Sequence, residues 1–288
     1  MSGRDFARST LGRTGLPVGR LGLGSSFGAP AAAIERAYDA GCNYLYWGSI
    51  RRPGFGKAIR NVCRRDRDNV VLVLQTYARV AALMPSGVKR GLRALKTDHA
   101  DVLLLGWFQQ QPPDALMEAA LRLKEQGHVR FLAMSTHHRP LAGEIAAATP
   151  GSTVAEQPID ILHVRYNAAH RGAEREVFPH LPADRATGPG LVSFTATRWG
   201  SLLKRRRSYP DEVQGPATAT DCYRFALSHE APDVVIAGPA STEQLDLALA
   251  ALRAGPMSDD ELARIRAWGD VVHADPPFNA SGALFSKF

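Results

Sequence analysis

Val88-Lys-Arg-Gly-Leu-Arg-Ala-Leu-Lys-Thr-Asp-His-Ala-Asp-Val-Leu-Leu-Leu105 is the stretch of sequence that decides the fold. Its first half carries Val88, Leu92 and Leu95 at a spacing that places them on one face of an α-helix. Its second half, Asp101–Leu105, is a short apolar run typical of a strand buried on both faces. A helix leading directly into such a strand predicts one unit of an α/β fold with a parallel sheet.

The same unit recurs along the chain. Eight apolar runs predict strands at Arg20–Gly24, Asn43–Tyr46, Val71–Thr76, Asp101–Leu105, Arg130–Met134, Asp160–Val164, Leu191–Thr195 and Val234–Ala237. Segments between them show helical spacing at Ala31–Ala40, Val88–Leu95, Ala115–Lys124 and Leu141–Ala148. Eight strands alternating with helices in a chain of 288 residues predict a (β/α)8 TIM barrel. We therefore expect a single barrel domain over residues 1–288.

Two additions flank the predicted barrel. Ser9–Leu16 and Val18–Leu23 are joined around Gly15 and Pro17, and they predict a small N-terminal β-hairpin that plugs the bottom of the barrel. After the eighth unit, Ser258–Val272 predicts a final helix, and a C-terminal tail, residues 275–288, follows it. The aromatic residues of this tail suggest that it folds across the barrel mouth, with an exposed tail as the alternative.

Composition narrows the class of protein. Hydrophobic residues make up 45% of the chain, and no apolar run approaches the length of a membrane span, so we expect a soluble cytoplasmic protein without a membrane partner. The net charge of +7 comes mostly from arginines scattered along the chain, with one tight basic run, Lys204–Arg207. Because the basic residues are scattered, we do not expect a nucleic-acid partner. Cys42, Cys63 and Cys222 are too few and too widely spaced for a disulfide framework or a metal site, and we expect reduced thiols.

Several motifs in order along the chain resemble the aldo-keto reductase family. They begin with the glycine-rich start at residues 11–24 and end with the loop and helix at residues 238–245. Between these two lie the segments 40–44, 91–105 and 127–135, which are similar to the family's second strand, its third helix with the fourth strand, and its fifth strand. The resemblance implies the (β/α)8 fold and a small-molecule ligand bound at the barrel mouth.

The family reduces carbonyl groups with NADPH, using a tetrad of Asp, Tyr, Lys and His at the strand ends. Tyr46 stands at the Asp position, Tyr77 at the Lys position and Gly106 at the His position, while the loop that should carry the Tyr, residues 47–53, contains none. Tyr46 and Tyr77 are the candidate catalytic residues, since a phenol can donate a proton if a cation lowers its pKa. Arg51, Arg52 or Arg79 could supply that charge; otherwise the two aromatic rings fill space left by the lost tetrad.

The cofactor positions match the family better than the tetrad does. By resemblance, Ser135, Thr136 and His163 lie against the nicotinamide carboxamide, Phe194 stacks on the ring, and Thr195 meets the pyrophosphate. The loop after that strand and the loop after the eighth strand would hold the phosphates, and the resemblance there implicates Gly200, Leu202, Lys204, Gly238, Ser241, Glu243 and Gln244. Backbone amides at a helix start suit a phosphate. NADP(H) is the expected cofactor, with NAD or loss of cofactor binding as alternatives.

Metal binding is not expected at the mouth. His137 and His138 are adjacent, so they should point to opposite faces of a strand, and no carboxylate or cysteine completes a set with His163. Trp47, Trp107 and Phe108 are expected to make the mouth aromatic.

Three functions therefore stay open. One is an NADP(H)-binding pseudoenzyme with little or no carbonyl reductase activity. The second is an atypical oxidoreductase that uses Tyr46 or Tyr77 as proton donor, and the third is a barrel recruited to a reaction that is not a redox reaction.

Overall fold

A computed structural model describes residues 5–24, 28–48, 52–148 and 159–275, and eight parallel strands close into a barrel within them. The barrel strands are β3 (Leu21–Gly24), β4 (Tyr44–Trp47), β5 (Val71–Thr76), β6 (Ala100–Leu105), β7 (Val129–Thr136), β8 (Ile161–Arg165), β9 (Gly190–Phe194) and β10 (Val234–Ala237). Each predicted strand overlaps an observed one. The strands neighbour one another in chain order, and β10 pairs with both β9 and β3 to close the ring. The predicted (β/α)8 fold is confirmed.

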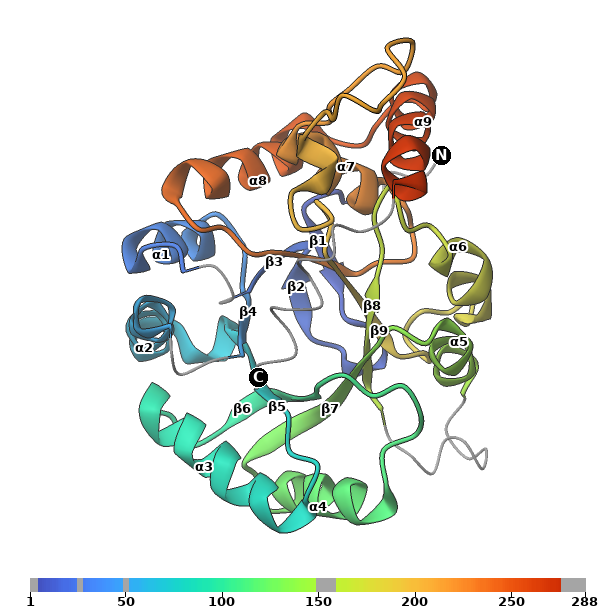
Figure 1. Cartoon of the computed structure of the whole chain (residues 1–288). Helices are drawn as coiled ribbons and strands as arrows, with labels where there is room; N and C mark the ends of the chain where they lie inside the picture. Colours follow the sequence, from blue (N-terminus) through green and yellow to red (C-terminus); the bar gives the residue numbers. More distant parts are fainter. Residues whose placement is uncertain (1–4, 25–27, 49–51, 149–158, 276–288) are drawn as a thin grey trace.

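Helices surround the strands on the outside of the barrel (Figure 1). They are α1 (Ala31–Asp39), α2 (Pro53–Asp66), α3 (Met84–Leu95), α4 (Asp114–Glu125), α5 (Arg139–Ala147), α6 (Ala173–Glu176), α7 (Ala219–Ser228), α8 (Thr242–Ala254) and α9 (Asp259–Ala274). Ser258 caps α9 through a capping box with Glu261, which fixes the start of the predicted final helix. The predicted tail beyond residue 275 lies outside the described residues. In the described parts of the chain, no helix is long and apolar enough to cross a membrane.

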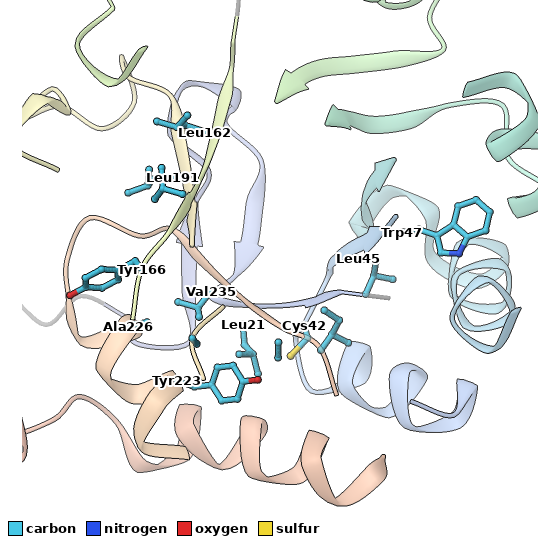
Figure 2. Close-up of a cluster of buried hydrophobic side chains, with 14 of the residues drawn as sticks. Leu21, Cys42, Leu45, Trp47, Leu162, Tyr166, Leu191, Tyr223, Ala226 and Val235 are labelled. Atoms are coloured by element: carbon cyan, nitrogen blue, oxygen red, sulfur yellow. The ribbon is translucent and has the colours of Figure 1, made fainter. Parts of the chain in front are cut away.

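Alternate residues of each strand separate two apolar layers. One layer fills the barrel itself and includes Tyr44, Val73, Val102, Ala133 and Ile161. The other lies between the strands and the helices, and Figure 2 shows part of it, with Leu21, Leu45, Trp47, Leu162 and Val235 among its members. Successive side chains of a strand point to opposite faces, so this division tells which residues of each strand can reach the mouth of the barrel.

The bottom of the barrel is covered by a two-stranded hairpin, β1 (Arg8–Thr10) with β2 (Pro17–Gly19). Leu11, between the two strands, is fully buried in the inner layer. Gly12 follows at a φ of +45°, and a Cβ there would lie 2.3 Å from the backbone nitrogen of Gly190, so the close approach requires glycine. The plug is confirmed, but the predicted second arm, Val18–Leu23, was wrong. It is divided at Arg20 into β2 and the barrel strand β3 because the two strands belong to different sheets.

Polar side chains tie the lower edge of the barrel together. Asp101, Asp160 and Asp233 precede or begin β6, β8 and β10, and each accepts a hydrogen bond of 2.8–2.9 Å from a backbone N–H of the preceding strand. Asp101 also binds the guanidinium groups of Arg67 and Arg130, both at 2.9 Å. Residues at this end of a TIM barrel serve stability, whereas the carboxyl ends of the strands form the functional face.

Candidate functional site

The mouth of the barrel is formed by the inward-facing residues at the carboxyl ends of the strands. Their strands and the alternation of the two apolar layers place the following residues there: Tyr46, Gln75, Tyr77, Gly106, Ser135, His137, His163, Arg165 and Phe194. The predicted site residues of β4 to β9 therefore share one end of the barrel. Trp47, which we expected at the mouth, instead packs in the outer layer against α2 and α3, because it is one residue out of phase with Tyr46.

The two candidate catalytic tyrosines form a cluster with Gln75. The hydroxyl of Tyr46 donates a hydrogen bond to Gln75 Oε1. Burial raises the pKa of Tyr46 well above its ordinary value, and the neighbouring Tyr77 raises it further. Tyr77 is more exposed, with 54% of its surface accessible, yet burial of its hydroxyl still raises its pKa. The groups that shift these two pKa values include no lysine, so neither phenol has the lowered pKa that a proton donor needs.

Gly106, which we predicted at the histidine position, has no free space beside it for a larger side chain. A Cβ on Gly106 would lie 2.5 Å from Gln75 Nε2 and 2.9 Å from Cε1 of Tyr77. Such distances are far below van der Waals contact, so the side chains of Gln75 and Tyr77 fill the space that a larger residue would need. Sequence analysis identified Tyr77 and Gly106 but missed Gln75, whose inward position two residues before Tyr77 was the available signal.

Arg79 does not activate the tyrosines. Its Nη2 donates to the carbonyl oxygens of Gly106 at 2.7 Å and Trp107 at 3.0 Å, and its guanidinium lies 4.2 Å from the centre of the Phe108 ring. Its charge lowers the pKa of Tyr77, but burial outweighs that effect. Arg51 lies outside the described residues, and Arg52 is not among the groups that shift either tyrosine. Arg79 thus fastens the turn after β6 to the loop after β5.

The predicted carboxamide residues lie side by side on β7 and β8. Ser135 pairs in register with His163, and both are at least 95% buried. Ser135 Oγ accepts a hydrogen bond of 2.9 Å from the backbone N–H of Trp107, and so keeps its own proton to donate. Thr136 Oγ1 accepts from the backbone N–H of His138 at 2.9 Å. These hydroxyls hold the turns after β6 and β7.

His163 makes a second contact inside the barrel. Its Nε2 lies 2.8 Å from the hydroxyl of Tyr44, whose ring belongs to the inner apolar layer. Burial lowers the pKa of His163 to about 3, so the imidazole is neutral at physiological pH. Within the described residues, its Nδ1 makes no hydrogen bond. A neutral imidazole presents one donor and one acceptor, which leaves one of these for a ligand at the mouth.

The loop after β9 is held by local hydrogen bonds and by a contact with α9. Thr195, at a φ of +60°, donates its hydroxyl proton to the carbonyl oxygen of Phe194 at 2.7 Å. Gly200 takes a φ of +81° and starts the short helical turn that buries Leu202, whose carbonyl oxygen accepts from Trp268 Nε1 at 2.8 Å. The side chain of Leu202 therefore belongs to the core, and its predicted contact with the cofactor stays a prediction.

The basic run of this loop is divided between two roles. Arg205 packs over Trp268, 5.2 Å from the ring centre, and Arg206 forms an ion pair with Asp275. Lys204 and Arg207 are exposed. Unlike Arg205 and Arg206, they make no ring contact or ion pair with the described residues.

The loop after β10 leads from Gly238 into α8. Ser241 is the N-cap of the helix, and its Oγ accepts from the backbone N–H of Gln244 at 3.3 Å. Gln244 Oε1 in turn accepts from the backbone N–H of Ala240 at 2.9 Å. A hydrogen bond from Ser241 lowers the pKa of Glu243, which places a negative charge in the first turn of α8. The amides suited to a phosphate are thus partly used within the loop.

Aromatic rings continue from Tyr77 across the mouth to Phe194. Tyr77 and Trp107 are 6.4 Å apart between ring centres, Trp107 and His137 6.1 Å, and His137 and Phe194 5.4 Å, all meeting edge to face. His138 does not share this row, because its Nδ1 caps the start of α5 by accepting from the backbone N–H of Leu141. Among the described residues, no three His, Cys, Asp or Glu side chains gather as a metal site.

Comparison with known proteins adds the following. The model of the "Aldo/keto reductase family" matches residues 24–219. Among solved structures, the aldo-keto reductase AKR11C1 from Bacillus halodurans is similar in its holo form, with a TM-score of 0.70 and 20% identity, and in its apo form, with 0.69 and 21%. Both comparisons cover 91% of this chain and 95% of the other. At these identities the likeness concerns the fold.

Curated relatives match over shorter stretches. Methylglyoxal reductase DkgB of Salmonella typhi is 28% identical over 159 residues, which is 54% of this chain and 49% of the relative. The protein of the same name from Salmonella typhimurium is 29% identical over 127 residues, 42% of this chain and 43% of the relative. The match to this chain thus spans half or less of the length of these relatives.

Proposed function

The chain belongs to the aldo/keto reductase family, and on that premise we propose that it binds NADP(H) at the carboxyl-terminal face of the barrel with little or no conventional carbonyl reductase activity. The observation that carries the proposal is the filled space at Gly106. Gln75 and Tyr77 lie where a histidine at this position would have to stand. A site that has closed this space is built for a purpose other than the family's usual proton transfer.

The chemistry of carbonyl reduction explains why this matters. NADPH supplies the hydride, and the resulting alkoxide needs an acid within hydrogen-bond reach, worth about 10²–10⁴ in rate. In this chain the partly buried phenol of Tyr46 donates to Gln75 and has a raised pKa, so it holds its proton more tightly than an ordinary tyrosine. Tyr77 is the more accessible phenol, but its pKa is raised as well.

The residues at the nicotinamide end fit a cofactor. Ser135 and His163 face the mouth from paired positions on neighbouring strands, and each keeps one hydrogen-bonding function unused by the protein. Phe194, half-buried on the next strand, offers a ring for stacking. The residues at the phosphate end of the proposed cofactor site fit less well. The side chains of Ser241 and Gln244 already accept hydrogen bonds from backbone amides of their own loop, so these amides are not free for a phosphate. These contacts support binding through the nicotinamide half, with Lys204, Thr195 and Gly200 nearest to the pyrophosphate in this proposal.

Binding is tested first. Calorimetric titration of the purified protein with NADPH and NADH should show binding that Phe194→Leu weakens by about 3- to 10-fold, as expected for the loss of one aromatic stacking contact. Tyr38→Phe is the control, because Tyr38 lies on α1 and donates to Asp66 at 2.6 Å, away from the mouth. Absence of binding to either dinucleotide would refute the proposal.

Turnover is tested next. NADPH oxidation with 4-nitrobenzaldehyde should stay near the rate without enzyme. Turnover that Tyr77→Phe or Tyr46→Phe abolishes, and Tyr38→Phe leaves unchanged, would instead establish the alternative, an atypical oxidoreductase with a tyrosine proton donor. Tyr77 is the better of the two for this role, because 54% of its surface is accessible.

A further inference from the structure

Arg165 is an inward-facing charge at the end of β8. On this strand Ile161 belongs to the inner layer and Leu162 and Val164 to the outer layer, so Arg165 continues the inward row above Ile161 and His163. The side chain is half-buried. Its place at the carboxyl end of a barrel strand is the position from which TIM barrels contact their ligands.

Two aromatic rings meet beside this arginine. The register pairs Arg165 with Phe194 on β9. On the other side, Thr136 of β7 pairs with Val164, so His137 follows at the level of Arg165. The rings of His137 and Phe194 approach to 5.4 Å between centres, edge to face, although β8 lies between their strands. The strand position of Arg165 therefore lies between those of the two residues, whose rings meet across it.

The surroundings of Arg165 are positively charged. Burial lowers its pKa, and the charges of Arg139 and Arg198 lower it further. Nearby carboxylates serve other groups: Glu176 binds Arg139 at 2.9 Å and Asp270 binds Arg171 at 2.6 Å. Among the described residues, Arg165 itself has neither a hydrogen bond nor an ion pair. An uncompensated, partly buried guanidinium costs stability unless a ligand neutralises it.

Two imidazoles whose pKa values Arg165 affects each have a buried ring nitrogen without a hydrogen bond. His137 Nδ1 and His170 Nδ1 are buried, and within the described residues neither has a hydrogen-bond partner. The pKa of His137 is lowered by burial and then by Arg165, and the pKa of His170 is lowered to about 3 by burial and then by Arg165 and Arg198. Buried polar atoms in native proteins nearly always have partners, so these two nitrogens leave hydrogen-bonding capacity that a ligand could use.

We propose that Arg165, with His137 and Arg139 beside it, binds the carboxylate or phosphate group of a small ligand in the barrel mouth next to Phe194. A guanidinium suits either group through paired hydrogen bonds. The ring of Trp107, 6.1 Å from His137, extends the same wall and suits an aromatic or apolar ligand body. The ligand class is thus an acidic small molecule, not a neutral aldehyde; its position beside the nicotinamide rests on the proposed function.

The proposed anion site adjoins the nicotinamide contacts Ser135 and His163 but is separate from the proposed phosphate contacts of the dinucleotide. The strand order around the barrel is β7, β8, β9, β10, and the proposed phosphate contacts, Thr195, Lys204 and Ser241, follow β9 and β10. Arg165, His137 and Arg139 belong to β8 and to the segment after β7, on the other side of Phe194. We therefore expect the acidic ligand and the cofactor to bind together without competing for the same charges.

The test is a calorimetric titration with benzoate and with inorganic phosphate, at constant ionic strength, with and without saturating NADPH. Arg165→Ala and Arg165→Gln should weaken binding of at least one of these anions about tenfold or more, since a charge-assisted hydrogen bond is lost. The anion affinity of Arg165→Lys should lie between those of the wild type and of the two other Arg165 variants. Arg175→Ala, an exposed arginine of α6 outside the mouth, should bind as the wild type does.

Stability gives a second readout. Removing Arg165 relieves repulsion from Arg139 and Arg198, so Arg165→Gln should leave the melting temperature of the ligand-free protein unchanged or higher, and benzoate or phosphate should raise it in the wild type alone. A lower melting temperature in Arg165→Gln, together with unchanged anion affinity, would show a merely structural arginine and overturn the proposal.

Cofactor titrations separate the remaining outcomes. NADPH affinity should change less than about threefold in Arg165→Ala. An anion that competes with NADPH, combined with a loss of NADPH affinity in Arg165→Ala, would assign Arg165 to the pyrophosphate and overturn the proposal. If the wild type binds no NADPH, the proposed function fails, while the titration of the cofactor-free protein still decides the anion site.

Discussion

Acid should destabilise this protein through His163, and His163→Gln should remove that sensitivity. The imidazole is buried in the barrel and bonded to Tyr44, and its pKa is lowered to about 3. In the unfolded chain the same group has a pKa of about 6.5. Below about pH 6.5 the imidazole of His163 is protonated in the unfolded state but stays neutral in the native state. The free energy of unfolding is therefore highest, as far as His163 is concerned, above about pH 6.5, and it decreases as the pH falls from there toward about 3.

The size of the effect follows from the two pKa values. Between pH 7 and pH 5, His163 alone should lower the free energy of unfolding by about 2 kcal/mol. His170, whose pKa is also lowered to about 3, adds a loss of the same sign, so the wild type should fall by more than this amount. Glutamine at position 163 cannot take up a proton and still has an amide to pair with the Tyr44 hydroxyl.

Urea unfolding at pH 7, 6 and 5, followed by circular dichroism, measures the effect. His163→Gln should lose about 2 kcal/mol less than the wild type between pH 7 and pH 5. His180→Gln, at an exposed position, should lose as much as the wild type. If His163→Gln and the wild type lose the same free energy, the histidine is not held neutral in the native barrel and the reasoning is refuted.

Two substitutions and one labelling experiment test the packing. Gly106→Ala should lower the free energy of unfolding by about 1–3 kcal/mol through overpacking against Gln75, and less in a Gln75→Ala background; equal losses in both backgrounds would contradict the assigned contact. Asp101→Ala should cost about 3 kcal/mol in urea unfolding, because two guanidinium groups lose a buried carboxylate; a loss below about 1 kcal/mol would place that carboxylate among ordinary surface pairs. Burial raises the pKa of Cys42 to about 12 and also raises that of Cys222, so both thiols should react with a disulfide reagent at pH 8 only as fast as the protein opens; labelling at the rate of a free thiol would contradict this.

The sequence by itself determined the barrel, because strand and helix spacing are local signals. Apolar runs such as Asp101–Leu105 became β6, and the helix before it became α3. The ends of the strands were harder to predict. Strand β7 continues through Ser135 and Thr136, although their polar side chains interrupt the apolar run, because their backbone stays paired with β8. The loss of the family's tetrad stays a prediction from the sequence, because it depends on residue identity at positions that only the neighbouring motifs assign.

Only the tertiary structure decided what occupies the mouth. Trp47 lies outside the mouth because the pairing of β4 with β3 and β5 sets which alternate residues of the strand point outward. Gln75 and Tyr77 close the space at Gly106, and Arg165 pairs in register with Phe194, whose ring meets that of His137. Each of these contacts joins strands separated by many residues along the chain. Such contacts depend on barrel closure and side-chain volume, and neither quantity is written in any local pattern of the sequence.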